Sequence, residues 1–205
     1  MIHDAVESLK GHYGEFLCEL IGSGTENKIE KFIHKLSEPT ATDNVSSSSE
    51  ISEFFLKQGS ALLYFCPESG DAAFHLANPT EWDELEEEFS EWIEMLDDDE
   101  KSDALPPWFG SHKVIGEIPS SGNYLLVVES GGELGSIYMF DHDGFEFYKL
   151  ASSLSEFIST VIDPNPRFLS SMASHMRFVT DDNWHQQWWL KELRHNSGKV
   201  VVNVD

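Results

Sequence analysis

Apolar residues recur every three or four positions through the first 36 residues, a spacing typical of amphipathic helices. The first set ends near Gly22 and Gly24, which favour a helix stop. The second set follows Thr25, which can cap a helix, and stops before Pro39. The two sets are Ile2, Val6, Leu9, Tyr13, Phe16, Leu17 and Leu20, and then Ile29, Phe32, Ile33 and Leu36. The pattern predicts an N-terminal helical region over residues 1–38.

The polar stretch over residues 39–49 is rich in serine and predicts a surface loop. Residues 50–205 are expected to form the main α+β unit with a C-terminal extension, and the whole chain to form one compact domain. This unit opens with a short helix in "ISEFFLKQ", which Gly59 ends. Two short apolar runs rich in β-forming residues follow, "ALLYFC" and "AAFHLA", and they predict a pair of strands.

The segment from Thr80 to Leu96 has the period of a helix with one apolar face. Thr80 and Asp83 are spaced to form a capping pair at its start. The apolar side chains fall within an arc of roughly 100° and are expected to be buried against the sheet. They are Trp82, Leu85, Phe89, Trp92, Ile93 and Leu96. Acidic residues occupy the rest of the helix circumference.

From His112 onward, short runs rich in β-forming residues alternate with turn sequences that contain Gly, Asn or Asp. The runs "HKVIGEI", "YLLVVES", "SIYMFD" and "FEFYKL" therefore predict four consecutive antiparallel strands up to Leu150. The capping box "SLSE" then opens a helix, which Pro164 and Pro166 end. The tail segment "HMRFVTDDNWHQQWWLKEL" is compatible with a strand, a turn and a helix, or with two helices.

The charge balance changes the choice of partners. The chain has 37 acidic residues against 13 lysines and arginines, a formal net charge of −24. Nucleic acid and anionic membranes are polyanions, so we expect neither as a partner and favour a basic protein or cations. Thirteen of the acids lie between Thr80 and Asp103, where Lys101 is the one basic residue. Cys18 and Cys66 are expected to be reduced thiols, and the absence of a long apolar run favours the cytoplasm.

Motifs for catalysis or cofactors are weak. "DHDG" at Asp141–Gly144 resembles the start of a calcium loop, but Phe145 and Ser152 stand where that loop needs oxygen ligands, so we expect a hairpin turn. His142 between two aspartates is the tightest polar group in the sequence. No zinc helix, P-loop or serine-nucleophile elbow is present. We therefore predict no catalytic residues, no metal site and no cofactor. Trp184, Trp188 and Trp189 are expected to pack within the protein, and the alternative is that one or two of them face a partner.

Part of the chain resembles a known protein family. The run from Ala104 to Ile158 resembles the central part of the SUKH superfamily (Smi/Knr type). It has a Pro-Trp loop, a strand ending in "GEIPSSGNY", a Gly-rich turn before "GSIYMFDHDGFEF", and the helix "SLSEFI". "ISEFFLKQGSALLYF" and "NPTEWDELEEEFSEWIEML" also fit, so the likeness covers roughly residues 50–162, and more weakly "MRFVTDDNWHQQWW". The family's Asn-Gly-Gly turn is replaced here by Gln58-Gly59-Ser60.

The resemblance implies an α+β fold with an antiparallel or mixed sheet flanked by helices. It also implies a non-enzymatic role. Bacterial members are mostly cytoplasmic immunity proteins that bind the toxin domains of polymorphic or contact-dependent toxins, many of them nucleases. Fungal members act as adaptors or regulators of cell-wall synthesis, and this role remains the alternative. The oligomeric state stays open.

The outward acids of the helix are our predicted contact with the cognate toxin. They are Glu84, Glu87, Glu88, Glu91, Glu94 and Asp98. A nuclease holds nucleic acid in a basic groove, so an acidic helix can occupy that groove, and opposite charge speeds the encounter. The simpler interpretation is that these acids only keep the protein in solution.

Overall fold

The structure is a computed structural model, and it describes residues 2–22, 26–40, 43–165, 168, 177–179, 187–195 and 200–203. The α-helices in this part of the chain are α1 (Ile2–Gly11), α2 (Ser49–Lys57), α3 (Trp82–Glu94), α4 (Asp98–Ala104) and α5 (Leu154–Ile162). The first six strands are β1 (Gly14–Leu20), β2 (Asn27–Leu36), β3 (Ala61–Phe65), β4 (Phe74–Leu76), β5 (His112–Ile118) and β6 (Asn123–Val128). The others are β7 (Ile137–Asp141), β8 (Glu146–Ala151), β9 (Arg177–Val179), β10 (Gln187–His195) and β11 (Val200–Asn203).

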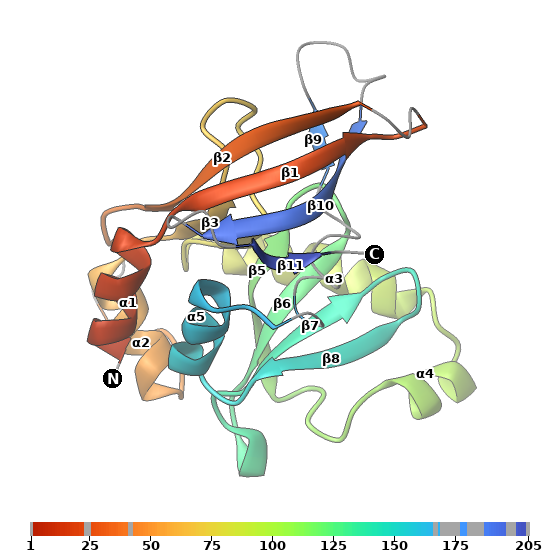
Figure 1. Ribbon diagram of the computed structural model, residues 1–205. Helices are drawn as coiled ribbons and strands as arrows, with labels where there is room; N and C mark the ends of the chain where they lie inside the picture. Colours follow the sequence, from red (N-terminus) through yellow and green to blue (C-terminus); the bar gives the residue numbers. More distant parts are fainter. Residues whose placement is uncertain are drawn as a thin grey trace.

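The strands form one sheet in the order β11-β10-β1-β2-β3-β4-β5-β6-β7-β8, and β9 pairs with β10. Every strand pair in the described part of the chain is antiparallel. Helices α1, α2 and α5 pack together beside the sheet (Figure 1). The predicted class, α+β with an antiparallel sheet and flanking helices, is confirmed. No helix in these residue ranges is long and apolar enough to cross a membrane.

The strand pair β3–β4 and the four-stranded meander β5–β8 are also confirmed. A single turn of 3₁₀ helix, η1 (Gly131–Glu133), lies in the loop between β6 and β7. The "DHDG" segment is a hairpin turn, as predicted. Its positive φ falls on Phe145, at 50°, rather than on Gly144.

The N-terminal helical region is the largest error of the sequence interpretation. Helix α1 ends at Gly11, and residues that were expected to continue it form β1. The second expected helix is β2, which pairs with β1 and β3. The physical reason is visible in β2, where Glu30, Phe32 and His34 point inward while Ile29 and Ile33 are exposed. The buried Phe32 and the exposed Ile29 and Ile33 lie on opposite faces of the strand, but their positions in the sequence together match the spacing of a helix.

In the tail, the strand of the first alternative is present as β9, but the helix that both alternatives expected over the tryptophan-rich segment is wrong. The tryptophan-rich segment lies partly in strand β10, which pairs with β1, β9 and β11. Trp184 and the side chains of Trp188 and Trp189 lie outside the described residues, so their expected roles stay predictions.

The core joins residues from Ile2 to Leu193 in one apolar cluster. All six residues of β6 are buried, and successive side chains of a strand point to opposite faces, so both faces of the sheet are covered here. Helix α3 covers the face that carries Tyr124, because the rings of Phe89 and Tyr124 lie 5.8 Å apart. Helix α5 begins at the predicted cap, where Ser153 accepts a hydrogen bond from the backbone N–H of Glu156. The sheet therefore supports α3 from behind and leaves its other side to solvent.

Candidate functional site

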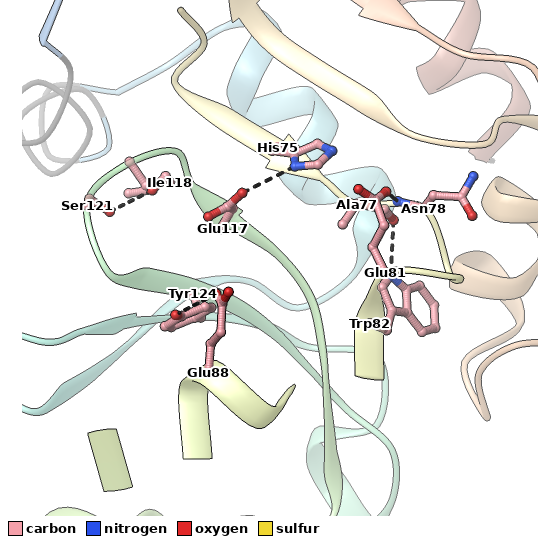
Figure 2. A network of polar contacts seen from close by, with 10 residues as sticks. All are labelled: His75, Ala77, Asn78, Glu81, Trp82, Glu88, Glu117, Ile118, Ser121 and Tyr124. Carbon is pink, nitrogen blue, oxygen red and sulfur yellow. Dashed lines mark hydrogen bonds and ion pairs between the residues drawn. The ribbon is translucent and has the colours of Figure 1, made fainter. Parts of the chain in front are cut away.

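Helix α3 begins one residue later than a Thr80 cap would place it. The first residue before the helix is Glu81, and no side chain caps it. Thr80 instead bonds to Asn78, whose Oδ1 accepts from the Thr80 N–H at 3.1 Å and the Thr80 hydroxyl at 2.9 Å. The Glu81 carboxylate accepts from the Asn78 N–H at 2.8 Å (Figure 2). The expected Thr80–Asp83 capping pair is therefore wrong, because Asn78 holds Thr80 in the preceding turn.

The apolar side of α3 is buried largely as predicted. Trp82, Leu85, Phe89 and Ile93 are buried, whereas Trp92 and Leu96 are only partly so. Trp82 is anchored by a hydrogen bond from its indole N–H to the carbonyl of Ala77, at 3.0 Å (Figure 2).

Trp92 departs from the prediction because it packs on a hairpin turn rather than deep against the sheet. Its ring lies 4.8 Å from that of His142 and 6.4 Å from that of Phe145, measured between centroids.

The six predicted contact residues Glu84, Glu87, Glu88, Glu91, Glu94 and Asp98 are all exposed. We call the five glutamates on α3 the acidic face. Asp98 belongs to the separate helix α4, because Asp97 begins a new helix with a capping box to Glu100. Within the described residues, none of the six forms an ion pair with a lysine, arginine or histidine. Their charge is displayed toward solvent on a helix that the core holds in place.

Glu88 differs from the other glutamates of the acidic face because it forms a hydrogen bond with a residue of the sheet. The hydroxyl of Tyr124 donates to its carboxylate at 3.3 Å (Figure 2). Burial, and next the nearby Glu88 carboxylate, raise the pKa of Tyr124 to about 12, so the phenol stays protonated as a donor. Glu88 is therefore tied to the sheet, while no such contact with a described residue holds the other four glutamates of the acidic face.

Sequence reasoning missed the flank of α3 that faces β5. Glu86 lies there, between the buried and outward sides of the helix. Its carboxylate accepts from the backbone N–H of Val114 at 3.2 Å and lies 3.4 Å from Nε2 of His112. No helical pattern could have found this group, because His112 and Val114 come from a strand that only the fold brings close.

Side chains that could hold a cation gather at the turn of Asp141, His142 and Asp143, whose ligand atoms lie within 4.8 Å of one another. The His142 ring lies between Asn123 Oδ1, 2.7 Å from Nδ1, and Asp143 Oδ1, 3.2 Å from Nε2. Asp143 is exposed and the other two residues are partly buried, and exposed acidic groups are common without a metal. The expected absence of a metal site stays a prediction.

The outer face of β2 exposes Ile29 and Ile33, at 51% and 44%, between lysines of the same strand. Cys18 and Cys66 are both free and buried, as expected for reduced thiols. Burial raises the pKa of Cys18 to about 12, so this thiol is a poor nucleophile.

No family model, curated protein sequence or solved structure matches this chain. The resemblance to the SUKH superfamily therefore stays a prediction.

Proposed function

We propose that this chain is a non-enzymatic immunity protein with a SUKH-like fold, which binds and neutralises a cognate toxin domain in the cytoplasm. The observation that carries the proposal is the acidic face of α3, which is exposed and without ion pairs among the described residues. Charge left unpaired within one chain is available to a basic surface on another. A nuclease toxin supplies such a surface, because it must hold a polyanion.

The packing of α3 against the sheet supports this role. Phe89 packs against the rings of Tyr124 and Phe140, at 5.8 and 5.2 Å between centroids. The carboxylates are therefore carried on a fixed backbone at helical spacing, unlike those of a disordered acidic tail. A surface that is ordered before binding loses little conformational entropy on binding, so more of its electrostatic attraction is retained as affinity.

Co-purification with the product of the neighbouring upstream gene tests the proposal most directly. We expect a tight complex that abolishes the toxin's activity. Recovery of a cellular protein without toxin activity would instead favour the adaptor role. Turnover of a substrate by the purified chain would contradict a non-enzymatic role.

A pair of matched variants tests the acidic face. Glu84→Lys with Glu91→Lys changes the charge by +4 on α3, and Glu38→Lys with Glu68→Lys makes the same change at exposed loop positions. We expect both variants to melt like the wild type, since exposed substitutions usually change stability by less than about 0.5 kcal/mol. Association with the toxin at low salt should slow by roughly tenfold for the α3 variant and much less for the loop variant.

The kinetics are measured at low and high ionic strength. Association rates that do not respond to salt would mean that the charge serves solubility alone. Equal slowing of the two variants would mean that the whole-molecule field, rather than this face, guides the encounter.

A further inference from the structure

A cavity of about 480 Å³ lies beside α3 on the flank that faces β5. Asp83 and Glu86 line it from α3, and His112 and Lys113 line it from β5, with Trp82 in its wall. We call this the Glu86–His112 cavity. It lies on the same helix as the acidic face but uses different residues.

His112 contributes a buried polar group without a hydrogen bond. Its side chain is 5% exposed. Nδ1 accepts from the backbone N–H of Gly110 at 3.2 Å, so in the neutral ring Nε2 carries the proton. Nε2 is buried and has no hydrogen-bond partner in the structure. Oε1 of Glu86, at 3.4 Å, is near enough for electrostatic attraction but beyond the usual range of an N–H···O bond.

The Glu86 carboxylate is ionised and is fixed in place by contacts with β5. Burial acts to raise the pKa of Glu86, but His112 and the Val114 N–H outweigh it, so the pKa of Glu86 lies below its usual value. The Glu86 side chain as a whole is still 41% exposed. Two of its contacts come from the strand behind it, which leaves its remaining acceptor directions for a ligand. Asp83, exposed and three residues earlier, lies on the same side of the helix.

The one lysine that lines the cavity forms no ion pair with these acids. Lys113 Nζ donates to the carbonyl of Val45 at 2.5 Å and lies 5.7 Å from the ring centre of Trp82. Within the described residues, no lysine or arginine forms an ion pair with Asp83 or Glu86. The cavity therefore combines two carboxylates with a buried N–H donor that lacks an acceptor.

We propose that the Glu86–His112 cavity receives an arginine side chain of the partner protein. This inference rests on the proposed function, because it takes the partner to be a basic protein. Arginine fits better than lysine, since its planar fork of N–H donors can bond to two carboxylate groups at once. The His112 Nε2–H, 3.4 Å from Oε1, faces the Glu86 carboxylate from behind, while the guanidinium pairs with that carboxylate from the open side of the cavity.

A short peptide tests the cavity without the toxin. The probe is acetyl-Gly-Arg-Gly-amide, and its control carries citrulline, which has the same shape without the charge, in place of arginine. NMR spectra follow the indole N–H of Trp82, assigned with Trp82→Phe, and the ring signals of His112. We expect the arginine peptide to shift these signals saturably and the citrulline peptide to leave them unchanged.

Two variants locate the binding. Glu86→Gln keeps an oxygen that can accept from the Val114 N–H, while Asp103→Asn removes an exposed charge on the neighbouring helix α4, outside the cavity and outside the acidic face. Loss of a charge-assisted hydrogen bond should weaken peptide binding by roughly tenfold or more in Glu86→Gln. Asp103→Asn should bind like the wild type. Thermal melts of both variants confirm that they are folded.

Several results would overturn the proposal. These are shifts spread evenly over the acidic surface, equal binding of both peptides, or a Glu86→Gln variant that binds as tightly as the wild type. A toxin complex unaffected by Glu86→Gln but weakened by Glu84→Lys with Glu91→Lys would remove the cavity and keep the proposed function. Peptide binding that needs Glu86, in a chain that binds no toxin, would keep the cavity as an arginine site and remove the toxin as its partner.

Discussion

The buried histidine pair His12–His34 makes the stability of this protein depend on pH. Tyr64 donates its backbone N–H to Nδ1 of His34 at 3.1 Å, so this nitrogen is unprotonated. Nε2 of His34 then carries the proton and donates to Nδ1 of His12 at 2.8 Å. A second proton on His34 would break the bond to Tyr64. Burial, and next the charge of His12, lower the pKa of His34 from 6.5 to about 3.

The sign follows from which state takes up the proton. Below pH 6.5 the unfolded chain binds a proton at His34 that the folded chain refuses until about pH 3, so acid favours the unfolded state in this window. The contribution of His34 is fully present at neutral pH and is lost as the pH falls toward 3. Between pH 7 and pH 5 the loss amounts to about 2 kcal/mol of unfolding free energy.

The assay is urea denaturation at pH 7, 6 and 5 for the wild type and for His34→Gln. A glutamine oxygen can accept from Tyr64 and its amide can donate to His12, but it does not titrate. Other groups titrate in both proteins, so the informative quantity is the difference in their unfolding free energies. We expect the advantage of the wild type to shrink by about 2 kcal/mol between pH 7 and pH 5. A constant difference, or a His34 ring that titrates near pH 6.5 by NMR in the folded protein, would refute the reasoning.

Three further substitutions test the fold. Phe89→Ala removes a ring that is 1% exposed and should lower the unfolding free energy by about 3–5 kcal/mol in urea denaturation; a loss below about 1 kcal/mol would mean that α3 is loosely packed. Ser153→Ala removes the cap that accepts from the Glu156 N–H at 3.1 Å and should cost about 1 kcal/mol, measured in the same way; an unchanged midpoint would contradict the cap. Gly116→Ala places a Cβ 2.0 Å from the carbonyl oxygen of His75, so it should break the β4–β5 pairing and abolish the cooperative thermal transition seen by circular dichroism. A normal transition would show that the strands can separate without loss of the fold.

The elements that the sequence predicted correctly are those in which one pattern dominates. Helix α3 has more than three turns of unbroken period, and the meander β5–β8 has turn residues at short intervals. The prediction for strand β2 was wrong because polar residues occupy some of its buried positions, so the sequence lacks the alternation of apolar and polar residues that is typical of a strand. Glu30 is buried beside Lys28, with 2.5 Å between Oε1 and Nζ, and His34 is buried against His12. A sequence does not show that such polar groups have partners, so their positions look like an outward face.

The same limit applies to the functional surface. The outward acids of α3 follow from the helical wheel, because exposure on a helix is a local property. The cavity at Glu86 does not, since its character depends on His112, 26 positions further along the chain, and on the hydrogen bond that Gly110 makes to that ring. Asp98 was misassigned for a related reason, because Asp97 can cap a new helix as well as continue the old one.

The pairing of β1 with β10 has a consequence for how the chain folds as it is synthesised. Gly14 lies opposite His195, whereas the strands of the meander pair with their immediate neighbours in sequence. Contacts that are close in sequence form quickly, and those that close a long loop form late. The meander can therefore assemble soon after its residues leave the ribosome. The outer edge of β1 stays unpaired until β10 has been synthesised, close to the end of the sequence. During that interval the backbone N–H and C=O groups of this edge are open to pairing with a second nascent chain, and domain-swapped dimers are the misfolded product to look for.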